Sequence, residues 1–117
     1  MGLDMYLYRN GDEEKEIGYW RKANAIHKWF VDNTQDGKDE CQISDVSIEQ
    51  ILVLYNLCKK VLKNPKRYFD LLPPQEGFFF GGIDYSDYYI EYVKDTKKIL
   101  KKCLNNPLEK YQYQASW

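Results

Sequence analysis

Several residues that could bind a ligand lie close together within the first third of this sequence. At helical spacing, one stripe contains Trp20, Asn24, His27 and Val31, and Arg21 and Lys28 lie beside it. An indole offers a stacking surface, a guanidinium binds anions through two parallel hydrogen bonds, and an imidazole titrates near neutral pH. The set therefore indicates a site for a planar anionic ligand such as a nucleotide. The alternative interpretation is structural, with Trp20 and His27 packed on a sheet and Arg21 paired with an acid such as Glu16.

A second candidate site lies where the glycine-bounded run 77–82 leads into an aromatic helix. Glycines allow a ligand to approach the backbone closely, and a helix N-terminus favours an anion. We therefore place Tyr85 and Tyr88 with the predicted ligand-binding residues. However, Asp84 and Asp87 already occupy this helix start, as acids commonly do, which argues against a bound phosphate. The alternative is a tight turn between a strand and a helix.

Basic residues form a third group, and two interpretations of it stay open. They are Lys59, Lys60, Lys63, Lys66, Arg67, Lys94, Lys97, Lys98, Lys101 and Lys102. Lysines late in helices complement the helix dipole, so a solvated face explains them. Nucleic-acid contact is the other interpretation, but no aromatic residue is interleaved at these positions. With 17 basic and 18 acidic residues the net charge is −1, so we do not expect a nucleic-acid partner.

Motifs for the common catalytic mechanisms are absent from the sequence. It contains no G-x-x-x-x-G-K-[ST], G-x-G-x-x-G or G-x-S-x-G motif, and its single histidine excludes H-E-x-x-H. Cys41, Cys58 and Cys103 are widely spaced and form no C-x-x-C pair, which predicts free thiols in a reducing compartment rather than a zinc site. We therefore expect no cofactor, no metal and no catalytic residue. An enzyme acting on a nucleotide-like ligand stays open as a weaker alternative.

Strand patterns at the two ends of the chain predict a small sheet. Leu3 to Arg9 alternates between apolar and polar residues, and Asn10-Gly11 is a hairpin signal. The charged return arm, 12–17, is either a short edge strand or a loop. The tail alternates from Tyr111 to Trp117, which predicts a further strand beside the first one.

Three helices are expected to pack on that sheet, over residues 19–32, 48–63 and 85–104. In the first, Tyr19, Ala23, Ile26 and Phe30 should face the core. The second begins with a Ser47/Gln50 capping box and is apolar over most of its circumference, so it should be the central, most buried helix. Asn64-Pro65 ends it and starts a short helical turn, and 78–80 reads as a short buried strand. The 117 residues thus predict a single α+β domain, with three main helices packed on a small, mostly antiparallel sheet.

Composition also bears on location and partners. The N-terminus lacks the basic and apolar regions of a signal peptide, and no apolar stretch is long enough to cross a membrane, so we expect a cytoplasmic protein without a membrane partner. Tyrosine is abundant, at 11 residues. Because tyrosine suits half-buried positions and interfaces, these residues either line half-buried faces or form a surface for a partner or a homodimer.

Three strings of this sequence resemble an uncharacterised family of small proteins encoded by bacteriophages and prophages. They are GLDMYL at 2–7, YWRKANAIHKWF at 19–30 and GFFFG at 77–81. The resemblance runs from the first strand through the last helix and supplies no catalytic residues. It implies a phage origin, and with it action in the host cytoplasm, more than a mechanism. Since small phage accessory proteins often blunt host defences by binding, we expect this one to bind and inhibit a host defence protein, as anti-CRISPR proteins do. A sponge for a signalling nucleotide is the alternative.

Overall fold

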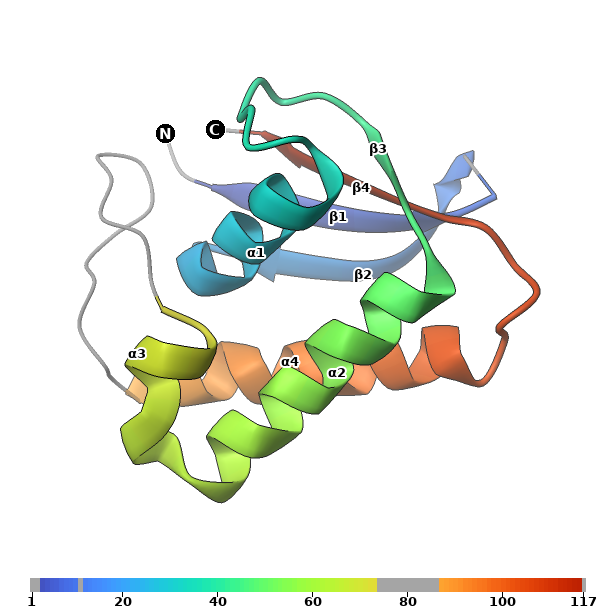
Figure 1. The fold of residues 1–117 in the computed structure, drawn as a ribbon. Helices are drawn as coiled ribbons and strands as arrows, with labels where there is room; N and C mark the ends of the chain where they lie inside the picture. Colours follow the sequence, from blue (N-terminus) through green and yellow to red (C-terminus); the bar gives the residue numbers. More distant parts are fainter. Residues whose placement is uncertain (1–2, 11, 74–86, 117) are drawn as a thin grey trace.

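The computed structural model contains a four-stranded sheet in which every pairing is antiparallel (Figure 1). Strand β1 (Asp4–Arg9) pairs with β2 (Asp12–Arg21) on one side and with β4 (Tyr111–Ser116) on the other. Strand β3 (Ser44–Val46) joins the far side of β4, which gives the order β2-β1-β4-β3. The prediction that the tail lies beside the first strand is confirmed. β3 has no counterpart in the sequence analysis because three residues are too few to show a period.

The hairpin between β1 and β2 corrects the predicted start of the first helix. Asn10 has a φ of 58°, as the turn signal requires, and the charged return arm is a strand and not a loop. This strand continues through Tyr19, Trp20 and Arg21, which the helical spacing had placed in a helix. Met5 faces Trp20 across the ladder, and Lys22 then reverses the chain with a φ of 56°. Backbone pairing with β1, together with the preference of aromatic side chains for strands, outweighs the helical spacing of apolar residues in this stretch.

The helices among the described residues are α1 (Asn24–Thr34), α2 (Ile48–Lys63), α3 (Tyr68–Leu71) and α4 (Asp87–Leu104). A short 3-10 turn (Pro65–Arg67) joins α2 to α3, as Asn64-Pro65 predicts. In Figure 1, α1 lies against the sheet, and α2 and α4 pack on each other beneath it. None of the helices in the described part of the chain is long and apolar enough to cross a membrane.

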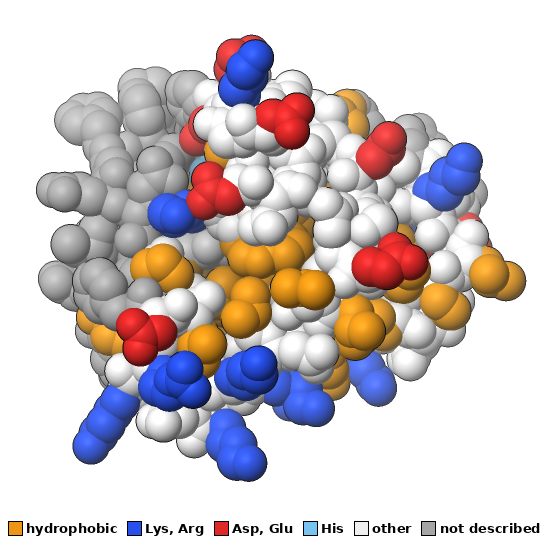
Figure 2. Space-filling view, in the orientation of Figure 1, with side chains coloured by type: hydrophobic (Ala, Val, Ile, Leu, Met, Phe, Trp, Pro, Cys, Tyr) orange, Lys and Arg blue, Asp and Glu red, His pale blue; other side chains and the backbone are white. Residues whose placement is uncertain are grey.

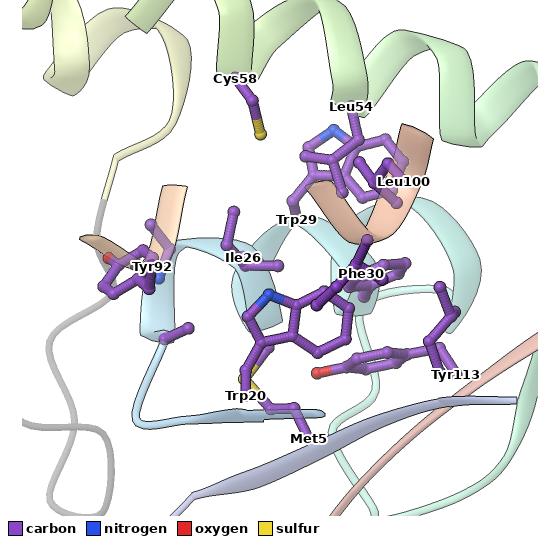
Figure 3. Packing of buried hydrophobic residues seen from close by; sticks show 14 of the residues in the cluster. Met5, Trp20, Ile26, Trp29, Phe30, Leu54, Cys58, Tyr92, Leu100 and Tyr113 are labelled. Atoms are coloured by element: carbon purple, nitrogen blue, oxygen red, sulfur yellow. Dashed lines mark hydrogen bonds between the residues drawn. The ribbon is translucent and has the colours of Figure 1, made fainter. Parts of the chain in front are cut away.

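One hydrophobic core joins the sheet to the helices (Figure 3). Leu3, Met5 and Leu7 are fully buried, as their alternation predicts. The Trp20 ring lies between the sheet and α1, with its centroid 6.2 Å from that of Phe30. Phe30 in turn stacks on Tyr113 of β4, with centroids 3.9 Å apart and ring planes within 9°. The side of the sheet that carries Met5 and Trp20 is therefore the side that the helices cover.

Helix α2 begins and ends where the sequence predicts, but it is not the most buried helix. Ser47 and Gln50 form the predicted capping box. Ile51, Leu54, Cys58 and Val61 are buried, whereas Leu52 and Val53 are about half exposed, at 47% and 53%. The number of apolar residues around a helix does not show which of its sides is covered by a neighbouring element. Here α4 packs on one side of α2, and Leu52 and Val53 are left partly exposed.

The structure describes residues 3–10, 12–73 and 87–116. The predicted strand at 78–80, the glycine-bounded run 77–82 and Tyr85 lie outside these residues. Within them, the three longer helices and the antiparallel sheet confirm the predicted α+β fold class.

Gly18 provides a test of how closely α4 packs on the sheet. A Cβ added at this buried position of β2 would lie 2.5 Å from Cγ2 of Ile99. We expect Gly18→Ala to lower the free energy of unfolding by about 1–3 kcal/mol because the core is overpacked there. Denaturant unfolding would measure the change.

A double-mutant cycle supplies the control. Leucine at position 99 has no γ-methyl branch at Cβ, so the cost of Gly18→Ala should fall in the Ile99→Leu background. An equal cost in both backgrounds would show that the contact between β2 and α4 is not the cause.

Candidate functional site

Trp20 is held inside the fold rather than on an open helix face. Its ring is 3% exposed, and its Nε1 donates a hydrogen bond to Thr96 Oγ1 on α4 at 2.6 Å. The Thr96 hydroxyl donates onward to the carbonyl of Tyr92 at 2.6 Å. Both polar atoms are therefore satisfied within the protein, and the indole joins β2 to α4. A ligand could stack on this ring only after the sheet and the helices had separated.

His27 is also buried, in a network that closes the fold. Its side chain is 1% exposed, with Nδ1 2.7 Å from Tyr113 Oη and Nε2 2.9 Å from Asp39 Oδ1. Because a carboxylate accepts, Nε2 carries the proton and Nδ1 accepts from the tyrosine hydroxyl. Burial lowers the pKa of His27, against the opposing effect of the hydrogen bond and charge of Asp39. The network resembles a catalytic relay, but its terminal hydroxyl on Tyr113 is fully buried and burial raises its pKa well above the ordinary value.

The remaining residues of the predicted nucleotide site divide between the interior and the surface. Asn24 is 3% exposed at the first position of α1. Arg21 is exposed at the end of β2, and Tyr88 on α4 is 49% exposed and donates a hydrogen bond to the Arg21 carbonyl. The structure thus brings Arg21 and Tyr88 together at the surface and separates them from the three buried side chains.

Tyrosines gather on the side of the sheet that faces away from the helices. Tyr6 and Tyr8 occupy positions of β1 that alternate with Met5 and Leu7, and Tyr19 is the direct cross-strand partner of Tyr6. Tyr6 is half-buried, whereas Tyr8 is buried, with 8% of its surface exposed. The ring centroids of Tyr6 and Tyr8 are 6.0 Å apart, and those of Tyr6 and Tyr19 are 5.4 Å apart. Arg21 follows on the same side of β2, two residues beyond Tyr19. We call these four residues, Tyr6, Tyr8, Tyr19 and Arg21, the tyrosine face.

Hydrogen bonds hold the rings of the tyrosine face in place. The Tyr19 hydroxyl donates to Asp4 Oδ1 at 2.6 Å, and the Tyr8 hydroxyl donates to Gln114 Oε1 at 3.4 Å. The hydrogen bond to Asp4 is the main reason that the pKa of Tyr19 is raised to about 12, so this hydroxyl stays protonated. Rings fixed by neighbours lose little rotamer freedom on binding, which suits them to contact a partner.

The cysteines are placed where the sequence predicts. Cys58 and Cys103 are buried, and burial raises the pKa of each thiol to about 12, so both stay protonated and are poor nucleophiles. Cys41 is partly exposed, and its carbonyl accepts a hydrogen bond from Gln114 Nε2.

The tyrosine face was not predicted from the sequence because the helical spacing placed Tyr19 and Arg21 in a helix. The alternation of Met5, Tyr6, Leu7 and Tyr8 does indicate that the two tyrosines share one side of a strand. It does not indicate that Tyr19 lies beside them, because that depends on the pairing of β1 with β2. No protein-family model matches the chain, and neither the curated proteins nor the solved structures give a significant match. The resemblance to phage proteins therefore stays a prediction.

The single histidine gives the structure a specific pH dependence. An unfolded histidine titrates near 6.5, whereas buried His27 takes up its proton only at lower pH. Below about pH 6.5 the unfolded chain binds a proton that the folded chain does not, so the free energy of unfolding falls as the pH falls. The loss should approach about 1.4 kcal/mol per pH unit until the folded pKa is reached. Denaturant unfolding at pH 7.5, 6.5 and 5.5 would measure it.

Two variants separate titration from packing. His27→Gln should be less stable at pH 7.5 but flatter between about pH 7 and 5.5, whereas Tyr113→Phe should lose about 1–3 kcal/mol and keep the slope. An unchanged slope in His27→Gln would contradict the assignment, because the chain has no other histidine.

Proposed function

We propose that this protein is a phage accessory protein that inhibits a host defence protein by binding it through the tyrosine face. The observation that carries the proposal is the row of tyrosines with one arginine on the side of the sheet opposite the helices, where Tyr6, Tyr19 and Arg21 are accessible and Tyr8 supports Tyr6 from a buried position. Tyrosine, tryptophan and arginine are the side chains that most often dominate binding energy at protein interfaces.

The geometry of the face supports protein recognition more than small-molecule recognition. Tyr19, at 47% exposure, and the half-buried Tyr6 are the accessible rings of the face, and Tyr8 is buried beside them, so the rings form a shallow row on paired strands. A small ligand needs a concave site that covers most of its surface. A protein partner needs ordered side chains on a broad surface, and the ring contacts and hydrogen bonds supply that order.

The resemblance of the three sequence strings supports the phage origin and the cytoplasm of the host as the place of action. GLDMYL contains Asp4 and Tyr6, and YWRKANAIHKWF contains Tyr19 and Arg21, so two of the three strings contribute to the tyrosine face. The string YWRKANAIHKWF also contains the buried Trp20 and His27, so it combines residues of the core with residues of the proposed surface.

The test is to isolate the partner and then remove the tyrosine face. The tagged protein should capture one host defence protein in a stoichiometric complex, which should re-form from purified components and inhibit the activity of that protein. Tyr19→Ala and Arg21→Ala should each weaken the complex by about 2 kcal/mol, or about 30-fold. Titration calorimetry would measure the affinity.

Matched controls come from exposed residues elsewhere on the molecule. Leu108→Ala, at a side chain that is 99% exposed, and Lys63→Ala, which removes an exposed cation from α2, should leave the affinity unchanged. Failure to recover any stoichiometric partner, or a complex that Tyr19→Ala and Arg21→Ala do not weaken, would contradict the proposal.

A further inference from the structure

The basic residues of α2 and α4 lie on one side of the molecule. Ten of the 17 Lys and Arg residues are on α2, the following 3-10 turn and α4. In Figure 2, most Lys and Arg side chains lie along the lower edge of the face and others lie at its top and sides, whereas Asp and Glu lie mainly above a central band of apolar side chains. A net charge of −1 therefore conceals a strong separation of charge.

These cations are not neutralised within the described residues. The ion pairs found there join His27 to Asp39 and Lys28 to Asp32, and no basic residue of α2, the 3-10 turn or α4 lies within 4.0 Å of a carboxylate of the described residues. Like charges four residues apart, as in Lys97 and Lys101, destabilise a helix. Asp95 and Glu91 are the nearest acids along α4, and they leave a large excess of positive charge.

A groove between α2 and α4 combines these cations with an aromatic ring. It has a volume of about 480 Å³ and is lined by Tyr55, Leu62, Lys94, Lys97, Lys98 and Lys101. The Nζ atoms of Lys59 and Lys101 lie 5.7 and 6.0 Å from the centroid of the Tyr55 ring. The sequence argued against nucleic acid because no aromatic was interleaved with the lysines. The packing of α2 on α4 supplies one, since it places Tyr55 beside Lys101.

The basic surface continues beyond this groove. Tyr55, Lys59 and Lys63 succeed one another at intervals of four along α2, so they form one row on its surface. Lys63 also lines a second hollow of about 380 Å³, together with Lys60, Asn64 and Arg67. A row of cations that links two hollows fits an extended anion better than a compact one.

We propose that this basic groove binds single-stranded nucleic acid, with a base against the Tyr55 ring and successive phosphates on the lysines. Aromatic rings within a positively charged groove are the usual platform for unpaired bases, whereas the bases of a duplex are already stacked on each other. The groove lining offers lysines and a tyrosine but no amide or guanidinium group to read base edges. Binding is therefore independent of sequence. The inference does not rest on the proposed protein partner, because the tyrosine face lies on β1 and β2.

The experiment measures the affinity of a labelled oligothymidylate of about 15 nucleotides by fluorescence anisotropy. If about four phosphates are contacted, raising the salt from about 50 to 200 mM should weaken binding about 50-fold. Lys97→Gln/Lys101→Gln should weaken it about tenfold or more at low salt, and Tyr55→Leu about fivefold or more. Tyr55→Phe, which keeps the ring, should bind like the wild type.

Control variants and competitors decide the outcome. Lys38→Gln/Lys110→Gln removes two exposed lysines from other parts of the surface, and Tyr19→Ala changes the tyrosine face; both should bind normally. Circular dichroism would confirm that each variant is folded. No binding by the folded wild type at low salt, equal losses in the two lysine double variants, or full binding by folded Tyr55→Leu would each overturn the proposal. Thymidine monophosphate should compete much more weakly than the unlabelled oligomer at the same nucleotide concentration. Equal competition would show that the groove binds free nucleotides and would overturn the proposal of a polymeric ligand.

Discussion

The contact between Tyr113 and α1 is the one on which the rest of the structure depends. The Tyr113 ring stacks on Phe30, and its hydroxyl donates to His27, so one side chain of the last strand satisfies both an apolar and a polar group of α1. β4 also separates β1 from β3 in the sheet. Two residues that are 86 positions apart in the sequence, His27 and Tyr113, thus close the core. Separating them within the folded protein would remove a buried hydrogen bond, which costs stability.

This packing of β4 on α1 is one example of how two residues of the predicted ligand site, Trp20 and His27, serve the fold instead. Trp20 and His27 are large side chains that each carry a polar atom, and each finds its partner on a distant element, Thr96 on α4 and Tyr113 on β4. Once buried, their polar atoms fix which elements pack together. The residues next to Trp20 in the strand are therefore the ones that reach the surface. Tyr19 and Arg21 flank Trp20 on β2 and point to the other side of the sheet.

The two proposed binding surfaces follow from the same layered arrangement. Helices cover one side of the sheet, so the tyrosines of β1 and β2 lie on the opposite side. The outer sides of α2 and α4 carry the polar positions of two amphipathic helices together with the half-exposed Leu52 and Val53, and four of the lysines line the groove at Tyr55. One surface is aromatic and held by hydrogen bonds, and the other is cationic. They are therefore suited to partners of different chemistry.

The sequence by itself determined the local structure wherever one period was unambiguous. The alternation of Leu3, Met5 and Leu7 gave β1, and the Ser47/Gln50 capping box gave the first turn of α2. It could not decide the stretch around Trp20, where a helical period and a strand with aromatic residues compete, because pairing with Met5 on β1 supplies the deciding energy. Only the tertiary structure turned Trp20 and His27 inward and brought Tyr55 to Lys101, since each of these contacts joins elements far apart in the chain.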